Sequence, residues 1–196
     1  MSTRIPGLPV PWRHLDPALH RERHLDAGQI LFREGARSRG PWVVLDGEIE
    51  LVRHGGPGER VAVHRARAGE SIAEGSLFAA RYHCNAVAMV PSRVIGFARA
   101  AVLERFETDL GFASALAATL AADLQRTRRR LQLLSIRSAE ARVHAAVLDG
   151  LLDAGVARLA DVIALTPEAT SRALAALVSR GALVRLGRGR YAPAEQ

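Results

Sequence analysis

The sequence has no lysine, one cysteine and no long apolar run. A single cysteine, Cys84, cannot form a disulfide within the chain, so no disulfide framework is expected. No apolar run reaches the roughly 18 to 20 residues that a membrane-spanning helix needs, and the N-terminus lacks the apolar core of a secretion signal. With 48% hydrophobic and 24% charged residues, the composition is that of a folded globular protein. We therefore expect a cytoplasmic protein with no membrane partner.

Positive charge is concentrated in the last third of the chain. All 27 basic residues are arginine. Residues 125–196 hold 12 of them against 6 acidic residues, a net charge of +6, whereas residues 1–124 hold 15 against 14. Arginine makes bidentate contacts with phosphate and releases its counterions, so this segregation favours a nucleic-acid partner. On charge alone, a merely solvated arginine-rich surface is the alternative.

Short extended runs cut by glycine fill residues 29–98. The alternation in Glu48–Leu51 and turn signals such as Asp46-Gly47 predict antiparallel strands. Many short strands at this spacing build an antiparallel, jelly-roll-like β-roll. We assign residues 1–108 to this domain and expect an N-terminal helix in front of the strands.

The next stretch contains almost no glycine or proline and is rich in alanine and leucine. Its apolar residues recur at spacings of three and four, which is typical of one side of a long helix. Such a helix needs a packing partner, and an identical helix of a second chain is the simplest one. We assign residues 109–137 as a dimerisation helix, with packing on the chain's own β-roll alone as the alternative. The predicted interface residues are Phe112, Leu116, Leu120, Leu124, Leu131 and Leu134.

Residues 138–196 are predicted to form a winged helix-turn-helix domain. Thr166 can cap a helix that starts at Pro167, because its hydroxyl can accept from free backbone amides and proline has no amide to satisfy. A short helix and a tight turn before it complete the helix-turn-helix. The glycines around Arg188 then predict a hairpin, the wing. The fold class is thus α+β, with an N-terminal β-roll, a long helix and a C-terminal winged helix-turn-helix.

The second helix of this motif has the side chains needed to read duplex DNA. Glu168, Ser171 and Arg172 lie side by side near its N-terminus, at offsets of three and four. Arginine can bind O6 and N7 of guanine, and glutamate can accept from the amino group of cytosine. The arginines beyond this helix suit phosphates, which position a protein without reading sequence. The predicted DNA-binding residues are Thr166, Glu168, Ser171, Arg172, Arg180, Arg188 and Arg190.

This domain order resembles that of the Crp/Fnr transcription regulators. The resemblance covers residues 25–192 and is carried by "GQILFREG", "VVLDGEIELVR", "AGESIAEGSLF" and "LTPEATSRALAALVSRGAL". Glu168-x-x-Ser171-Arg172 matches the signature of the Fnr-like branch, which implies TTGAT-like half-sites in a two-fold symmetric operator. Thr170 departs from the family, which usually buries a larger aliphatic residue there. The resemblance further implies a homodimer, RNA polymerase as a partner, a sensor role for the β-roll and no enzymatic activity.

The resemblance also implies an effector cassette in the β-roll. In cyclic-nucleotide-binding members the cassette runs from a Gly-Glu pair to an Arg-Ser pair, whose arginine neutralises the cyclic phosphate, and a Thr-Ser pair on the long helix contacts the base. The corresponding positions here are Ala73-Glu74, Cys84-Asn85 and Thr127-Arg128. Because the phosphate-anchoring arginine is absent, we do not expect cyclic AMP to bind in the usual way. The candidate pocket residues are Ala73, Glu74, Arg81, His83, Cys84, Asn85, Thr127 and Arg128, of which Arg81 or Arg128 would have to supply the missing charge.

Three interpretations of Cys84 are open. Its thiolate could be redox-active if Arg81 and His83 stabilise it. His83 or Cys84 could instead be an axial haem ligand, whereas an iron-sulfur cluster needs several cysteines. The interpretation we favour is that Cys84 begins a buried strand as a small apolar residue. The effector and any cofactor are therefore left unassigned.

A jelly roll also fits a different class of function, a ligand-binding or metal-dependent cupin-like protein whose basic tail is incidental. Such an enzyme needs clustered histidines with a glutamate, whereas His54, His64 and His83 are well separated in the sequence. His20 and His24 lie four apart on the expected N-terminal helix but lack a third ligand at suitable spacing. We therefore predict no metal site and no catalytic residues.

Overall fold

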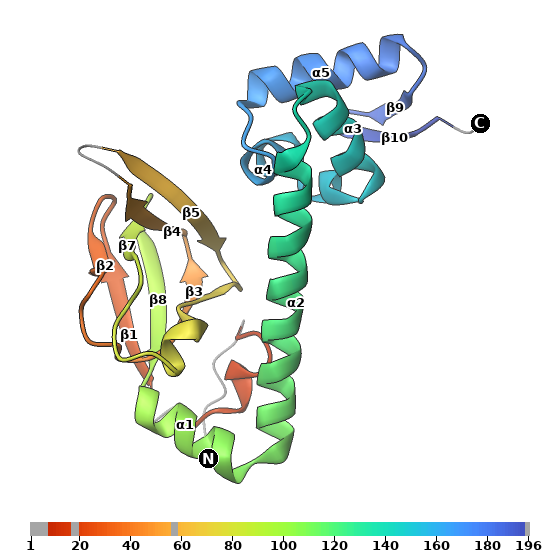
Figure 1. Cartoon of the computed structure of the whole chain (residues 1–196). Coiled ribbons are helices and arrows are strands. Elements are labelled where there is room, and N and C mark those ends of the chain that lie inside the picture. Colours follow the sequence, from red (N-terminus) through yellow and green to blue (C-terminus); the bar gives the residue numbers. More distant parts are fainter. Residues whose placement is uncertain (1–7, 17–19, 56–58, 195–196) are drawn as a thin grey trace. The chain divides into compact units, whose positions relative to one another are not determined.

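The structure, a computed structural model, describes residues 8–16, 20–55 and 59–194 (Figure 1). The chain divides into two compact units, Met1–Ala121 and Ala122–Gln196. The division falls inside the long helix α2 (Leu110–Ser135), which was expected between residues 109 and 137. The first unit holds two four-stranded antiparallel sheets and the second a helical domain with a small hairpin. This mixed α+β architecture confirms the predicted fold class.

The first unit is the β-roll. One sheet has the strand order β1-β8-β3-β6 and the other the order β2-β7-β4-β5. Gly47, with a φ of 85°, makes the tight turn between β3 and β4 that the sequence predicts. The strands are β1 (His20–Leu25), β2 (Ile30–Phe32), β3 (Trp42–Asp46), β4 (Glu48–His54), β5 (Arg60–Arg67), β6 (Ser71–Ile72), β7 (Asn85–Ala88) and β8 (Ser92–Phe97).

The core of the roll lies between the two sheets. Trp42 and Val94 come from the first sheet and Phe32 and Ile49 from the second, and all four are at most 7% exposed. The alternation of the strands sends every second side chain to this core. The complete cluster of buried residues is Leu25, Leu31, Phe32, Trp42, Val44, Ile49, Ala66, Ile72, Tyr82, Ala86, Ala88 and Val94.

Ion pairs join β4 and β5, which is the edge strand of its sheet. Glu50 is only 1% exposed, and its carboxylate pairs with Arg60 and with Arg65, whose Nε lies 2.7 Å from Oε1. One step along the strand pair, Arg67 Nε lies 2.7 Å from Glu48 Oε2. Because the side chain of Glu50 is buried, its charge depends on these arginines for compensation.

The predicted N-terminal helix around His20 and His24 is wrong. Residues 20–25 form β1, which pairs antiparallel with β8 at the edge of its sheet. Only Leu25 of this strand is buried, because the edge position leaves its charged residues in solvent. Before β1, the described residues contain a short 3₁₀ helix, η1 (Trp12–His14). The strand places both histidines on one face, with the exposed His24 Nε2 3.5 Å from Glu22 Oε1.

A second apolar cluster packs the helices that follow the strands onto the roll. It contains the fully buried Trp12, which stacks on Phe97 with ring centroids 5.5 Å apart, and residues of α1 (Arg99–Thr108) and α2. Phe112 and Leu116 of α2 are 3% and 0% exposed within this cluster. We predicted both at a dimer interface, and the structure corrects this, because they are core residues of their own β-roll unit.

The second unit has its own core. Leu159, Ile163 and Leu174 from three successive segments are fully buried in it, together with Leu183 of the hairpin. Its elements after α2 are α3 (Ala139–Leu148), η4 (Leu151–Ala154), α4 (Val156–Val162), α5 (Pro167–Ser179), β9 (Leu183–Gly187) and β10 (Arg190–Pro193). Among the described helices of the chain, none is long and apolar enough to cross a membrane.

Candidate functional site

Helix α5 presents the predicted base-reading side chains to solvent. The helix begins as the sequence predicts, with Pro167 at its first position and Thr166 as its cap, whose Oγ1 accepts from the Ala169 amide at 3.1 Å. Glu168, Ser171 and Arg172 are all exposed near this end. The opposite face is buried in the core of the second unit and consists of Thr170, Ala173, Leu174 and Leu177. The helix therefore has one packed face and one free polar face.

The position of Glu168 in the first turn of α5 stabilises the ionised form of its carboxyl group. The pKa of this carboxyl lies below its usual range, first because its own backbone amide and the Thr166 hydroxyl donate to it, and further because Arg172 is positively charged. Arg172 lies four residues further on and so on the same side of the helix. The site thus offers an ionised acceptor and a cationic donor next to each other.

Arginine side chains brace the turn between α4 and α5. Arg142 of α3 donates from Nη1 to the Ile163 carbonyl at 2.9 Å and from Nε and Nη2 to the Ile136 carbonyl at 3.0 and 2.8 Å. Arg130 donates from Nε to the Val162 carbonyl at 3.2 Å. These bonds satisfy carbonyls at helix ends that would otherwise lack partners. Nothing local in the sequence marks a side chain that binds a distant carbonyl, so these roles of Arg130 and Arg142 could not be predicted.

The wing is the antiparallel pair β9 and β10, with its turn at Gly187–Arg190. Arg188 and Arg190 are exposed, as predicted for residues that would meet phosphates. Arg185 of β9 is also exposed and donates from Nε to the Gly187 carbonyl at 3.3 Å. Arg185 is not among the predicted DNA-binding residues, although its place on the predicted hairpin marks it as a candidate.

Arg180 differs from the other predicted phosphate-binding residues. It is the C-cap of α5, and its guanidinium forms an ion pair with Glu140 of α3. This pair links the end of α5 to α3 within the second unit. Arg180 is 62% exposed at its side chain, so it has a structural partner while still facing solvent.

The first half of the predicted effector cassette forms a tight turn into the 3₁₀ helix η3 (Glu74–Leu77). Ala73 has a φ of 64°, a left-handed conformation that favours glycine. The turn is closed by Ser76, whose Oγ donates to the Ala73 carbonyl at 2.6 Å. Ser38 then donates to the Ser76 carbonyl at 2.9 Å. Ala73 and Glu74 are half-buried at this turn.

Tyr82 anchors the second half of the cassette in the roll. Its ring stacks on Phe32, with centroids 3.9 Å apart and an angle of 14° between the planes. Its buried hydroxyl accepts from Trp42 Nε1 and from the Arg39 amide and donates to the Gly40 carbonyl, at 3.3, 3.1 and 3.0 Å. Tyr82, two residues before Cys84, is thus a core residue of the roll.

Cys84 is half-buried and packs against the core of the roll just before β7 begins. Burial raises the pKa of its thiol, the Glu34 carboxylate raises it further, and Arg53 offsets part of this effect. Arg81 and His83, the neighbours that a redox-active thiolate would need, are not the charges that act on it. The proton is therefore held more tightly than in a free cysteine, the opposite of what a reactive thiolate needs.

The remaining cassette residues are engaged elsewhere or exposed. Arg81 donates from Nη1 to the Gly35 carbonyl at 2.6 Å. Asn85 accepts from the Glu34 amide at 2.9 Å through Oδ1. His83 is exposed. Glu34 itself forms an ion pair with Arg53, whose Nη2 lies 3.4 Å from Glu34 Oε1.

The predicted pocket residues on α2, Thr127 and Arg128, belong to the second unit and are exposed there. The predicted dimer-interface residues on the same helix differ in their exposure. Leu124 and Leu131 are 50% and 63% exposed, and Leu134 is half-buried. Leu120 is partly buried and packs against the second apolar cluster of the roll unit, which contains the buried Phe112.

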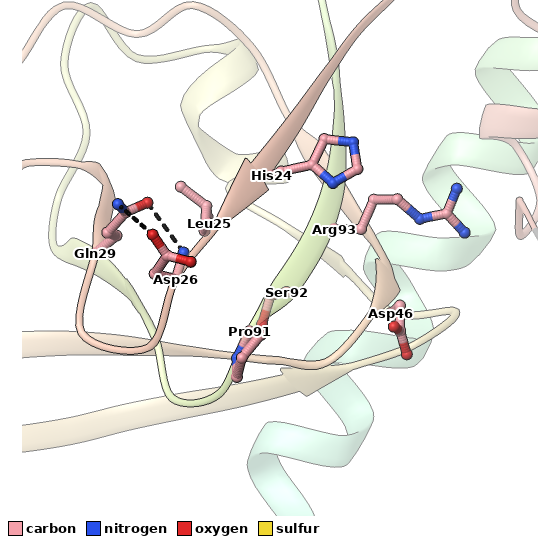
Figure 2. A pocket seen from close by; sticks show the side chains of 8 residues that line it. All are labelled: His24, Leu25, Asp26, Gln29, Asp46, Pro91, Ser92 and Arg93. Atoms are coloured by element: carbon pink, nitrogen blue, oxygen red, sulfur yellow. Dashed lines mark hydrogen bonds between the residues drawn. The ribbon is translucent and has the colours of Figure 1, made fainter.

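The roll has a surface pocket of about 540 Å³ beside β1 and β8 (Figure 2). None of the predicted cassette residues lines it. Asp26 and Gln29 hold its rim by two hydrogen bonds, from the Asp26 amide to Oε1 at 3.0 Å and from Gln29 Nε2 to Oδ2 at 3.1 Å. Its lining residues are His24, Leu25, Asp26, Gln29, Asp46, Pro91, Ser92 and Arg93. Among the described residues of the whole chain, no group of three or more His, Cys, Asp or Glu side chains is placed to hold a metal ion.

Comparisons with known proteins agree with this architecture. Residues 22–109 match the cyclic nucleotide-binding domain. A search of curated protein sequences finds no match. Among solved structures, FixK2 from Bradyrhizobium japonicum has a TM-score of 0.63 at 20% identity, with 90% of this chain and 93% of that chain covered.

Two further structures, both of proteins from Thermus thermophilus, have a similar fold. The catabolite activator protein of this organism has a TM-score of 0.52 at 27% identity, with 90% of this chain and 86% of that chain covered. A transcriptional regulator of the CRP family has a TM-score of 0.55 at 19% identity, with 88% and 92% covered. The chain thus contains a cyclic nucleotide-binding domain over residues 22–109, and its fold is similar to that of these transcription regulators.

Proposed function

We propose that this protein is a sequence-specific DNA-binding transcription regulator that acts as a homodimer in the cytoplasm. The observation that carries the proposal is the free polar face of α5, where Glu168, Ser171 and Arg172 are exposed at the capped end of a helix whose other face is buried. A helix of this kind enters the major groove with its N-terminal residues against the bases. RNA polymerase is the further partner that a regulator of this kind would need.

Each exposed side chain has a distinct role in this proposal. Arg172 donates to the O6 and N7 atoms of a guanine, and the ionised Glu168 accepts from a cytosine amino group. Ser171 contacts a base or a phosphate beside them. Arg188 and Arg190 on the wing bind phosphates, which adds affinity without sequence preference. Arg185 joins them from the neighbouring strand.

The test is binding of the full chain to a duplex with two TTGAT-like half-sites about one helical turn apart, compared with a scrambled duplex. Fluorescence anisotropy should give a clear preference for the symmetric site. Arg172→Ala should remove most of that preference, since each good bidentate base contact discriminates by about 1 to 3 kcal/mol. Arg23→Ala, an exposed arginine of the roll, is the matched control and should change nothing. Full retention of the preference in Arg172→Ala would refute the assignment.

The dimer part of the proposal is supported by α2. Leu124 and Leu131 leave large apolar side chains half or more exposed on a helix, which a partner helix would cover. The interface is therefore expected on the C-terminal part of α2 rather than at Phe112 and Leu116. Sedimentation of the full chain should give the mass of two copies.

For the effector, we propose that the cassette does not hold a cyclic phosphate through a charged anchor. Support comes from Cys84 at the anchor position, whose charged neighbours Glu34 and Arg53 form an ion pair with each other, and from the bond of Arg81 to a carbonyl. Calorimetry with cyclic AMP and cyclic GMP should detect no binding in the micromolar range. Micromolar binding that Glu74→Ala abolishes would contradict this part while leaving DNA binding untouched.

A further inference from the structure

We propose that the outer surface of the β-roll binds a phosphate-type anion between two arginines, Arg37 and Arg81. The anion is free phosphate or a small molecule that carries a phosphate group. Both arginines belong to the first unit, so the inference goes beyond the proposed DNA binding and does not depend on it.

A short antiparallel ladder holds the two arginines opposite each other. The loop between β2 and β3 pairs with the segment after η3, and Arg37 and Arg81 are the residues that form the bridge. The amides of Tyr82 and Ser38 donate to the carbonyls of the residues before Arg37 and before Arg81, respectively, both at 2.9 Å. Because these bonds flank the two arginines, they are a non-hydrogen-bonded pair, the kind whose side chains start closest together. Their Cβ atoms are expected to lie about 5 Å apart.

The ladder packs on the roll with one side and carries the arginines on the other. Successive side chains of an extended segment point to opposite sides. Tyr82 and Ser38, which follow the two arginines, are 4% and 6% exposed, whereas Arg37 and Arg81 are exposed. Cys84, two residues after Tyr82, also packs against the core. The anchor position of the predicted effector cassette is therefore on the inner side, and the two arginines form a separate site outside it.

The positive charge of this outer surface is not compensated within the ladder. Arg37 has no side-chain hydrogen bond or ion pair among the residues that the structure describes. Arg81 donates from Nη1 to a backbone carbonyl at 2.6 Å, which neutralises no charge. Alternation places Arg39 and His83, both exposed, on the same side as the pair. Glu34, the acidic residue of the same loop, already forms an ion pair with an arginine of β4.

This arrangement favours a phosphate group as the ligand. Like charges directly opposite each other in a ladder destabilise it, and an anion between them removes that cost. A guanidinium has five donors in a planar fork, so Arg81 keeps donors free after its bond to the carbonyl. A phosphate group has a charge of about −1.5 to −2 at pH 7 and three acceptor oxygens, so it can accept from both arginines at once. A carboxylate has a single charge and two oxygens.

Urea unfolding of the full chain tests whether the roll binds such an anion. Tryptophan fluorescence follows the roll, because Trp12 and Trp42 both lie in its apolar clusters. Millimolar sodium pyrophosphate should raise the urea midpoint of this transition, since a ligand that binds only the folded state stabilises it. Inorganic phosphate should act in the same direction with a smaller shift. Sodium chloride at equal ionic strength measures the part that comes from screening of the repulsion alone.

Variants locate the binding site. Arg37→Gln and Arg81→Gln should each raise the dissociation constant for pyrophosphate about tenfold, because each removes a charge-assisted hydrogen bond. Arg23→Gln, which removes an exposed arginine of β1 in the same unit, is the matched control and should leave that constant unchanged. Arg37→Glu should raise the midpoint without any anion, because it places an acid opposite Arg81, and should abolish the effect of pyrophosphate. Circular dichroism checks that each variant folds.

Each outcome decides one part of the inference. A pyrophosphate effect that persists in both glutamine variants, or that sodium chloride reproduces at equal ionic strength, overturns the site. A folded Arg37→Glu protein with a lower midpoint overturns the argument from like charges. A short polyglutamate peptide that stabilises the roll when pyrophosphate does not would overturn the phosphate ligand and indicate an acidic protein segment instead.

Discussion

Thr170→Val should stabilise the second unit. Thr170 lies on the packed face of α5 and is fully buried, and its Oγ1 has no hydrogen-bond partner among the described residues. A buried hydroxyl without a partner has lost its hydrogen bonds to water and gained none in return. Valine has nearly the same shape and replaces that hydroxyl with a methyl group. The substitution thus removes a cost while keeping the packing.

The magnitude follows from two terms. Leaving a buried polar group unsatisfied costs about 1 to 3 kcal/mol, and the new methyl group adds up to about 0.8 kcal/mol of apolar burial. Threonine and valine have similar helix propensities, so the backbone contributes little. Allowing for imperfect fit, Thr170→Val should raise the free energy of unfolding by about 1 to 2 kcal/mol. For a domain of this size that corresponds to a rise in Tm of roughly 5 to 15 °C.

The two units can be followed separately during urea unfolding. Both tryptophans, Trp12 and Trp42, lie in the roll, so their fluorescence reports the first unit, whereas far-UV circular dichroism follows the helices. Thr170→Val should move the helix transition to higher urea. Thr170→Ser, which keeps the hydroxyl and loses the methyl group, should move it to lower urea. An unchanged or lower midpoint for Thr170→Val would refute the reasoning, because it would mean that the hydroxyl has a stabilising partner.

Three other variants probe the remaining parts of the molecule. In the DNA-binding assay, Arg188→Ala should weaken binding to specific and scrambled duplexes alike and lower the salt dependence by about one phosphate contact, whereas Arg172→Ala should affect the specific duplex alone. Cys84 should react with a thiol reagent at a higher pH than a free cysteine because its pKa is raised, and Glu34→Gln should shift its reaction to lower pH by removing a negative charge; a shift to higher pH would contradict this. Glu50→Gln should lower the stability of the roll by about 1 to 3 kcal/mol in the fluorescence transition, because Arg60 and Arg65 lose their partner; an unchanged midpoint would show that the pair adds nothing.

The elements of the β-roll could be predicted because alternation and turn residues are local signals. β1 was the exception. Its sequence from His20 to Leu25 carries charged or histidine side chains at five of six positions, so that neither helical nor strand periodicity of apolar residues is present. Edge strands can carry such residues because one side of the strand meets solvent. Only its pairing with β8 reveals the strand, and that pairing joins residues about 70 positions apart in the chain.

The surroundings of Cys84 could not be predicted for a related reason. Sequence neighbours suggested Arg81 and His83, which lie within three residues of it. The strand that follows, β7, pairs with β2 on one side and β4 on the other, and this brings residues from those strands and their loops next to the thiol. Glu34 and Arg53 come from these segments. Across a sheet, the register decides which charge acts on a side chain, and the register is not a local property.

The apolar residues of α2 show a limit of predicting a helix interface from the spacing of apolar residues. Intervals of three and four identify a helix with apolar side chains, but two separate stripes on one helix satisfy the same intervals. One stripe, with Phe112 and Leu116, packs on the roll, and the other, with Leu124 and Leu131, stays exposed. Burial separates them, and the exposed stripe alone is available to a second chain.

The structure also shows that the arginines in the last third of the chain have different roles. Several of its arginines serve the fold, since Arg130 and Arg142 donate to backbone carbonyls and Arg180 pairs with Glu140. A guanidinium held in this way is not free to displace counterions from DNA. The charge available to a polyanion is therefore only a part of these arginines, and this part includes Arg172 on α5 and the exposed hairpin arginines. It follows that the salt dependence of DNA binding should reflect this small set in each copy rather than all 12 arginines of residues 125–196.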